Sequence, residues 1–351
     1  MRNAVGFQGI LYTLMIILVG LHTLPAQDKY RIAALGFYNL ENLFDLENDT
    51  TINDEDFLPT GSYLWNAEKY KEKMNHLARV ISELAIEKTP DGVAILGVAE
   101  VENRKVLEDL VKEPQIASRN YQIVHYNSPD ERGIDVGLLF NPKYFKVTAS
   151  KKLPVIIYGE DKQRNFTRDV LLVSGIFDGE PLHILVNHWP SRSGGEKVSD
   201  PWRVAAATVC KKACDSLLLD NPNAKYAIMG DLNDDPVNTS VKMVLRGKKD
   251  KEEVKKGDTF NPSYALYKKG LGTLAYRDAW SLFDQIILSP AWITPEVGGY
   301  QFFQFRVHNP SYMTQQSGQF KGYPLRTYVG TTYTAGYSDH FPTYIYMVKK
   351  M

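Results

Sequence analysis

The chain has 351 residues, which is enough for one large domain or two ordinary ones. It carries 41 Lys and Arg against 41 Asp and Glu, and 44% of its residues are hydrophobic. This composition excludes a disordered chain, a collagen-like repeat and a polytopic membrane protein. The zero formal net charge counts against a protein that coats nucleic acid, because such a protein needs excess basic charge to displace counterions.

The first 26 residues have the pattern of a secretory signal peptide. Arg2 gives a positive start, residues 10–21 form an apolar run, and the small Ala26 precedes polar residues. The run is too short to span a bilayer comfortably, although a buried first strand or an uncleaved anchor would also be apolar. We therefore expect cleavage near Ala26, a secreted or periplasmic protein and no transmembrane span after cleavage. With no internal repeat or linker in the remainder, we expect a single domain over 27–351.

Hydrophobic periodicity predicts alternating strands and helices, in the following order along the chain. The first half contains a strand at 31–39, a helix at 67–86, a strand at 93–100, a weaker helix at about 102–112, and strands at 136–140, 170–176 and 182–187. The second half contains a helix at 202–219, begun by Asp200 and Pro201, and strands at 225–229, 285–288 and 343–347. The charge-rich segment 247–257 is expected to be a solvated surface loop.

The order of these elements predicts an α/β protein. Several strands follow one another without a helix over 121–188, which indicates antiparallel pairing in that region. Continuous apolar strands indicate sheets that are buried on both faces, as in two packed sheets with helices outside. Cys210 and Cys214 lie four residues apart on the predicted helix 202–219, where geometry rarely suits a disulfide, so we expect two buried apolar residues.

Polar side chains occur repeatedly where the predicted strands begin or end. Because loops at strand ends are held by a rigid scaffold, ligand and catalytic groups collect there. Oxygen ligands without cysteine suit Mg²⁺, Mn²⁺ or Ca²⁺ rather than zinc or copper. Together with histidines, such a metal can hydrolyse a phosphate ester. The residues at these strand ends are Asn39, Glu100, Asn187, His188, Asp231, Asn233, Asp284, Asp339 and His340.

Each of these residues also has a structural explanation when it is taken alone. Asn39 suits a turn, residues 230–236 could form a turn before a helix, and both histidines could be ordinary hydrogen-bonded side chains. Glu100 is harder to explain in this way, because a carboxylate within an apolar run is seldom buried without a partner. Their joint occurrence at strand ends favours a catalytic site.

Together these motifs resemble the endonuclease/exonuclease/phosphatase superfamily, whose fold is deoxyribonuclease-I-like. The resemblance covers about 32–346 and keeps the order of the family motifs, including Gly230-Asp231-Leu232-Asn233 and Ser338-Asp339-His340. It implies a four-layer α/β sandwich, in which two mixed β-sheets pack face to face with helices outside. It also implies a single catalytic domain over 27–351 that hydrolyses phosphate esters with Mg²⁺, or with Mn²⁺ or Ca²⁺.

The resemblance also implies roles for individual residues. Glu100 would be the principal metal ligand, helped by Asn39, with Asp339 close to the metal and Asp231 a ligand if a second metal binds. The implied catalytic residues are His188, His340, Asp231, Asn233 and Asp284, with His340 as a base or charge stabiliser oriented by Asp284. The implied phosphate-binding residues are Arg168, Asn187, Asn233 and His188. Asp135 lies where family members often have a carboxylate or tyrosine partner.

The sequence leaves the substrate open. A secreted endonuclease-like phosphodiesterase is favoured, with DNA and RNA as candidate substrates. The alternatives are a phosphatase or phosphodiesterase for a lipid head group or sugar phosphate, and a non-catalytic secreted binding protein. The aromatic-rich segment 300–337 could form a specificity wall or a Tyr-rich surface that binds nothing. No stable protein partner is implied, and we expect a monomer.

Overall fold

The computed structural model describes residues 29–159 and 161–351. The predicted signal peptide and its cleavage point near Ala26 lie outside the described residues. Within the described ranges, no helix is both long enough and apolar enough to cross a bilayer.

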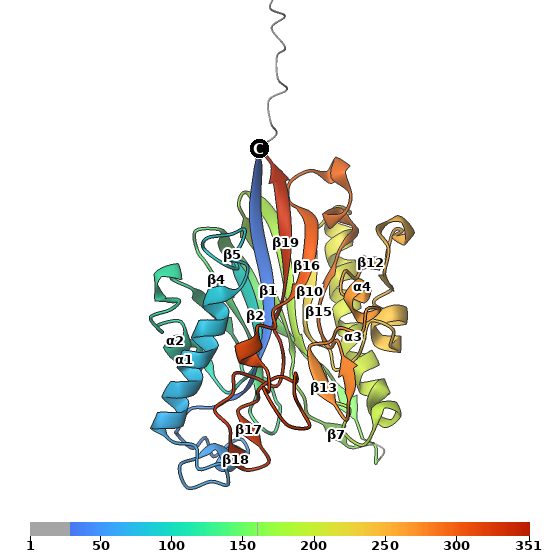
Figure 1. The fold of residues 1–351 in the computed structure, drawn as a ribbon. Coiled ribbons are helices and arrows are strands. Elements are labelled where there is room, and N and C mark those ends of the chain that lie inside the picture. The colour runs from blue at the N-terminus through green and yellow to red at the C-terminus, as the bar shows by residue number, and fades with distance from the viewer. Residues whose placement is uncertain (1–28, 160) are drawn as a thin grey trace, which may run out of the picture.

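Two mixed β-sheets form the centre of the protein (Figure 1). In the described residues, the first sheet has the strand order β16 (Gln301–Val307), β19 (Thr343–Lys350), β1 (Tyr30–Leu43), β2 (Ile95–Val101), β4 (Asp135–Phe140) and β3 (Gln122–His125). The second has the order β11 (Gly247–Lys248), β12 (Thr259–Phe260), β15 (Asp284–Leu288), β10 (Tyr226–Asp231), β9 (Glu180–His188), β8 (Val170–Phe177) and β5 (Phe145–Leu153).

Both sheets have a parallel pair at their centre. β1 runs parallel to β2, and β9 runs parallel to β10, so the carboxyl ends of each pair lie at one edge of its sheet. β19 is antiparallel to β1, and β15 is antiparallel to β10, so these two strands begin at the same edge at which their neighbours end. This topology explains why polar residues after some strands and before others can meet in one place.

Helices cover the outer faces of the two sheets (Figure 1). The helices in the described part of the chain are α1 (Ala67–Glu83), α2 (Arg104–Leu110), α3 (Glu196–Asp220) and α4 (Tyr264–Tyr267), with short 3₁₀ and π turns elsewhere. The Asn66 side chain caps α1 by accepting hydrogen bonds from two backbone N–H groups in the first turn. α1 and α2 pack on the first sheet, and α3 packs on the second.

The start of α3 differs from the sequence prediction. The helix begins at Glu196, and Pro201 lies inside it rather than at its first turn. Side chains hold the turn before the proline: Ser199 donates to the Gly195 carbonyl, and Arg203 donates to the Glu196 carbonyl. These contacts stabilise a helical turn that proline alone would not favour.

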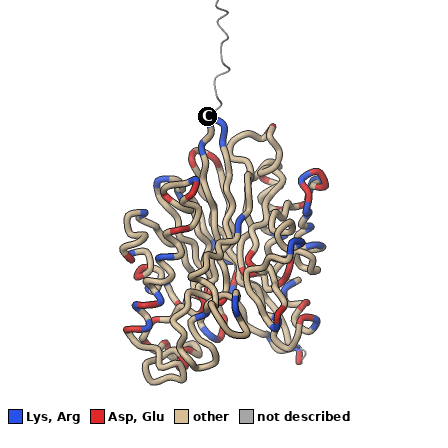
Figure 2. The backbone as a smooth tube through the Cα atoms, viewed as in Figure 1, with Lys and Arg blue, Asp and Glu red and all other residues tan. Residues whose placement is uncertain are grey.

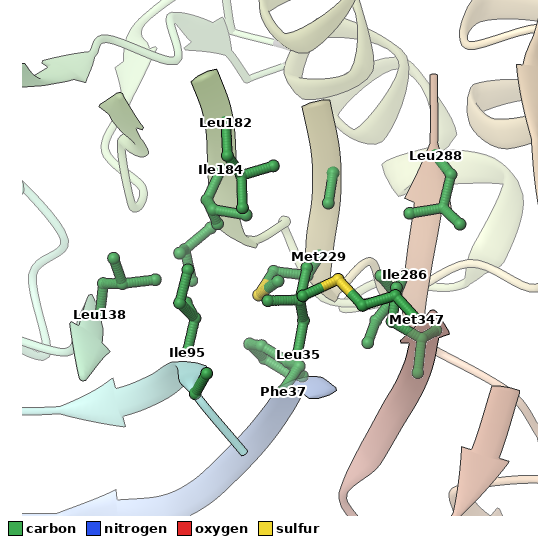
Figure 3. Close-up of a cluster of buried hydrophobic side chains, with 14 of the residues drawn as sticks. Leu35, Phe37, Ile95, Leu138, Leu182, Ile184, Met229, Ile286, Leu288 and Met347 are labelled. Carbon is green, nitrogen blue, oxygen red and sulfur yellow. The ribbon is translucent and has the colours of Figure 1, made fainter. Parts of the chain in front are cut away.

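The main hydrophobic core fills the space between the two sheets (Figure 3). Its residues range along the chain from Ala33 to Met347, so both halves of the sequence contribute to one core. Two further clusters lie between each sheet and its helices. The buried Cys210 and Cys214, on α3, are free thiols, as expected. The described chain is thus a four-layer α/β sandwich, which confirms the predicted fold class; the single-domain boundaries at 27–351 stay a prediction.

Several strands have no clear signal in the sequence. β5 has mostly exposed or half-buried residues because it is the edge strand of its sheet, and so it lacks an apolar run. Three two-stranded hairpins were also missed because their strands are too short to show a period. The hairpins are β6 (Ile157–Tyr158) with β7 (Arg164–Asn165), β13 (Leu274–Tyr276) with β14 (Ala279–Ser281), and β17 (Tyr328–Val329) with β18 (Thr332–Tyr333). Segment 247–257 is exposed or half-buried, as expected, although it contains β11.

Candidate active site

The strand ends of both sheets bring the predicted polar residues together. In the register of the second sheet, Asp231 is paired with His188 on one side and with Asp284 on the other. Asn39 and Glu100 come from the ends of β1 and β2 in the first sheet. His340 lies just before β19, and the Ser338 hydroxyl nearby donates to the Asn39 carbonyl. The site is therefore shared between the two sheets.

Asp231 lies at the centre of this group. Its Oδ2 atom is 3.7 Å from Nε2 of His188 and 3.7 Å from Nε2 of His340. The Nδ1 atom of His340 is 2.7 Å from Oδ2 of Asp284, a distance that fixes the orientation of the ring. The Nε2 atom of His188 is 3.8 Å from Oε1 of Glu100. Two carboxylate–histidine clusters thus share Asp231.

Asn39 connects the two sheets within the site. Its Nδ2 donates to Oε1 of Glu100 at 3.1 Å and to Oδ2 of Asp231 at 3.2 Å. Its Oδ1 accepts from the backbone N–H of Glu41, and the N–H of Asn42 donates to the other oxygen of Glu100. As placed, Asn39 holds the two carboxylates at a fixed separation.

The backbone around the site has unusual dihedral angles. Four residues other than glycine have positive φ: Glu41 at 52°, Asn42 at 50°, Glu100 at 60° and Asn233 at 49°. The register of β2 against β4 shifts between Ala99 and Val101, so Glu100 lies on a bulge. Such conformations cost about 1–3 kcal/mol each and occur preferentially at functional sites. This strain directs the Glu100 side chain into the site.

The two histidines have opposite electrostatic environments. Burial lowers the pKa of His188 well below its ordinary value, and the nearby Arg168 guanidinium lowers it further. Burial also disfavours the charged form of His340, but the carboxylates of Asp284 and Asp231 outweigh it and raise its pKa well above the ordinary value. The pKa of Asp231 is raised, chiefly because the carboxylate is buried. The surroundings of His188 thus favour the neutral ring, whereas those of His340 favour the protonated ring.

These residues fit a divalent cation. Two groups of acidic and histidine side chains have their ligand atoms within 4.8 Å of one another, namely Glu100 with His188 and Asp231, and Asp231 with Asp284 and His340. Oδ1 of Asp284 is buried without a hydrogen-bond partner, an arrangement that a cation would relieve. The carboxylate oxygens of these groups, without thiolate, are donors that suit Mg²⁺, Mn²⁺ or Ca²⁺.

Metal binding is expected to stabilise the fold. A ligand that binds only the folded state adds about 2.7 kcal/mol at a concentration one hundred times its Kd. We expect Mn²⁺ to raise the thermal unfolding temperature, and Glu100→Gln to reduce that rise, because the variant removes a charged ligand. Differential scanning calorimetry with and without Mn²⁺ measures both. Asp215→Asn, which removes a half-exposed carboxylate on α3, is the control and is expected to keep the full shift. An equal Mn²⁺ effect in both variants would contradict the assignment of Glu100.

Two predicted phosphate-binding residues lie behind the site surface. Asn187 is completely buried, and its amide donates to the carbonyls of Leu185 and Met229 while its oxygen accepts from Trp189 Nε1. The buried guanidinium of Arg168 donates to the carbonyls of His188 and Trp189 and pairs with Asp130 at 2.9 Å. Both side chains use their polar atoms to hold the strand end that carries His188. Their assignment as phosphate-binding residues stays a prediction.

The other predicted residues lie at the edge of the site. Asn233 donates from Nδ2 to the Trp189 carbonyl, and its own N–H donates to Asp231. Asp339 belongs to neither carboxylate–histidine cluster, and its Oδ2 is 2.5 Å from an Arg326 nitrogen. Asp135 is buried, with one carboxylate oxygen bonded to Ser128 and the other 3.1 Å from Nε2 of His125.

A second charged network, which the sequence analysis missed, supports the site. Glu41 is buried and accepts two hydrogen bonds from Thr327, one from the backbone and one from the hydroxyl. The fully buried Lys73 of α1 donates to the Thr327 hydroxyl at 2.6 Å and to the Tyr337 carbonyl at 3.0 Å. Its Nζ is 3.6 Å from Glu41, and Arg326 is also 3.6 Å from Glu41. A lysine beside Met74 and Leu77 on the apolar face of α1 was the available sequence signal.

Gly230 is required by a close backbone contact. A Cβ atom at this position would lie 2.3 Å from the Asn187 carbonyl oxygen on the neighbouring strand. We therefore expect Gly230→Ala to separate β10 from β9, to destabilise the protein and to lower activity, measured by urea unfolding and phosphodiester hydrolysis. Gly179→Ala is the matched control, because its Cβ would meet nothing within 4 Å although its φ is also positive. The explanation fails if Gly179→Ala is the more destabilising variant.

Comparison with known proteins agrees with this geometry. The sequence model of the "Endonuclease/Exonuclease/phosphatase family" matches residues 34–349. None of the curated proteins compared with the chain matches it.

Solved structures with the same fold share little sequence with the chain. An endonuclease/exonuclease/phosphatase family protein from Bacteroides thetaiotaomicron has a TM-score of 0.53 and 14% identity, covering 93% of this chain and 98% of that one. D. rerio TDP2 complexed with a single strand DNA product has a TM-score of 0.53 and 15% identity, covering 90% and 98%. Truncated Caenorhabditis elegans TDP2 has a TM-score of 0.52 and 15% identity, covering 90% and 97%. At these identities the likeness concerns the fold, whereas the sequence match spans nearly all of the chain. The chain belongs to the endonuclease/exonuclease/phosphatase family and is a metal-dependent phosphoesterase.

Proposed function

We propose that this protein is an endonuclease-like phosphodiesterase that cleaves nucleic acid with Mg²⁺ or Mn²⁺. The observation that carries this proposal is the pair of carboxylate–histidine clusters that share Asp231. The D. rerio TDP2 structure of the same fold, solved with a single strand DNA product, supports nucleic acid as the substrate class. Basic and acidic positions are interspersed over the outer elements, so the zero net charge does not exclude a locally bound phosphate (Figure 2).

The residues of the site divide the chemical work between them. His340, held by Asp284 and kept protonated, would donate a hydrogen bond to a phosphoryl oxygen and stabilise its charge. Asp231, which belongs to both clusters, would hold the attacking water and accept its proton. The neutral His188 would donate a hydrogen bond to the leaving oxygen as the P–O bond breaks, and that oxygen would take its proton from solvent water. Glu100 and Asp231 would hold the cation, which supplies positive charge opposite the phosphoryl oxygens.

Cleavage of a closed circular substrate tests the proposal directly. A supercoiled plasmid has no chain ends, so its conversion to nicked and linear forms requires an endonuclease. We expect this conversion with Mg²⁺ or Mn²⁺, its loss with a chelator and its loss in Glu100→Gln. Ca²⁺ is assayed in parallel, because its larger and more flexible coordination shell permits binding in the same carboxylate site.

Parallel substrates separate the alternatives. Hydrolysis of phosphatidylcholine vesicles or of a sugar phosphate, with the plasmid left intact, would replace the nuclease by the small-ester alternative. Absence of hydrolysis with plasmid, RNA, phospholipid and bis-p-nitrophenyl phosphate, under any of the three metals, would contradict a phosphoesterase. Size-exclusion chromatography with light scattering tests the proposed monomer.

We further propose that the chain is exported and that residues 1–26 are removed. The positive start, the apolar run and Ala26 support this proposal. Expression of the full chain in a bacterial host, followed by N-terminal sequencing of the extracytoplasmic protein, is expected to give Gln27 as the first residue. Retention of the intact chain inside the cell would contradict export.

A further inference from the structure

A cavity of about 400 Å³ opens beside the catalytic centre, and Asp339 is one of its lining residues. One wall is the β13–β14 hairpin, and the other is the segment 315–329 from the aromatic-rich part of the sequence. The proposed mechanism does not use this cavity. Its volume falls within the range of typical small-molecule binding sites.

The walls of the cavity are built from fixed side chains. The Tyr323 hydroxyl accepts from the Asp278 backbone N–H and donates to the Asp278 carboxylate, both at 2.7 Å. The Tyr323 ring lies 5.4 Å from that of Phe320 and 5.7 Å from that of Trp280. Trp280 in turn stacks on Phe341, the residue after His340. The cavity is therefore attached through packed rings to a catalytic histidine.

Large apolar side chains on these walls are exposed. Tyr276 is 67% exposed, Phe320 is 43% exposed and Val329 is 44% exposed. Exposed apolar side chains that gather around one cavity mark a binding site more often than a single exposed residue does. Two carboxamides, Gln315 and Gln319, also line the cavity and add hydrogen-bond donors and acceptors.

We propose that this cavity binds a nucleobase of the phosphodiester substrate, next to the phosphate that is cleaved; the inference rests on the proposed nuclease function. A nucleobase presents a flat π-face and a hydrogen-bonding edge, which match the aromatic rings and the carboxamides respectively. A lipid acyl chain would match the rings but would offer no hydrogen bond to the two carboxamides. It would also lie against charged side chains, because Arg277, Asp278 and Arg326 line the same cavity.

Arg326 lies between this cavity and a second one, an arrangement that suits a diester substrate. It also lines a second cavity of about 210 Å³, whose walls include Phe57, Tyr63 and Tyr328. Arg326 thus borders both cavities while pairing with Asp339 at the catalytic centre. A phosphodiester carries an organic group on each side of its phosphorus, so two cavities that share one arginine suit a diester better than a monoester.

The test compares a short single-stranded oligonucleotide with the same chain that lacks the base next to the cleaved phosphate. We expect Tyr276→Ala and Phe320→Ala each to lower kcat/KM for the base-bearing substrate by roughly 5–100-fold, the effect of losing one stacked base. Hydrolysis of the abasic substrate is expected to be unchanged. Phe303→Ala removes a ring that is 52% exposed on β16, and is the matched control with no expected effect on either substrate.

Binding gives a readout independent of turnover. Trp280 lies next to Tyr323 in the cavity wall, so we expect deoxyadenosine monophosphate to quench the fluorescence of Trp280 when it binds. Tyr276→Ala is expected to weaken the binding of this nucleotide. Trp280→Phe identifies the part of the signal that comes from this side chain. Equal losses in Tyr276→Ala on base-bearing and abasic substrates would overturn the inference while leaving the nuclease intact. If Tyr276→Ala loses activity only on phospholipid vesicles, the cavity is a lipid site and the nucleobase inference is wrong. If the wild-type protein cleaves neither oligonucleotide, the proposed nuclease function is wrong.

Discussion

His340→Ala is expected to lower kcat for phosphodiester hydrolysis by about 10²–10³-fold, the usual effect of removing one hydrogen-bond donor that stabilises charge in the transition state. The imidazole lies 3.7 Å from Asp231 and 2.7 Å from Asp284, so its removal takes the cationic partner away from two buried carboxylates. KM is expected to change much less than kcat, because the contact with the phosphoryl oxygen strengthens in the transition state. Steady-state kinetics on a defined oligonucleotide measure both constants.

Asp284→Asn tests whether Asp284 and His340 act together in catalysis. The amide keeps the size of the side chain but removes the charge that raises the pKa of His340. We expect the His340→Ala and Asp284→Asn double variant to lose little more activity than His340→Ala alone, because residues that act as a unit are not additive. The control is His183→Ala, a half-buried histidine on β9 that contacts Ser174 outside the site. Normal turnover in His340→Ala, or fully additive losses, would contradict the role given to the pair.

Lys73→Met is expected to destabilise the protein by about 3–5 kcal/mol, the cost of leaving a buried charge without its partner. The Lys73 side chain is fully buried, and its ammonium neutralises Glu41 and holds Thr327 and the Tyr337 carbonyl. Its loss leaves the buried Glu41 carboxylate with the half-exposed Arg326 as its cationic neighbour, and it frees the segment that precedes Asp339. Urea unfolding measures the stability, and the same preparation is assayed for hydrolysis.

Glu41→Gln distinguishes the lost ion pair from lost packing. In the Lys73→Met and Glu41→Gln double variant no unpaired charge stays buried, so we expect part of the stability to return. Lys71→Met replaces an exposed lysine on the same helix and is expected to change stability by no more than about 0.5 kcal/mol. If the double variant is less stable than Lys73→Met alone, the charge explanation is wrong and the contacts to Thr327 and Tyr337 dominate.

The elements that the sequence predicts well are those with a local signal. The central strands β1, β2, β9, β10 and β15 are buried on both faces, so each appears as a continuous apolar run. Edge strand β5 and the short hairpins lack such runs, because edges face solvent and two residues show no period. The predicted start of α3 was wrong because proline usually occupies the first turn of a helix. Here Ser199 and Arg203 stabilise an additional turn before Pro201, and these contacts have no local sequence signal.

The sequence by itself determined which residue types end the strands, and from these came the family, the metal-dependent chemistry and the candidate site around Asn39, Glu100, Asp231 and His340. Only the tertiary structure decided where each side chain points. It turns Asn187 and Arg168 inward to hold the backbone, pairs Asp339 with Arg326, and brings Lys73 from a distant helix to Glu41. These outcomes depend on contacts between separate strands, helices and loops and on strained backbone at Glu41 and Glu100, which no local pattern encodes. The cavity beside Asp339 also depends on the tertiary structure, because its two walls meet only when both sheets are in place.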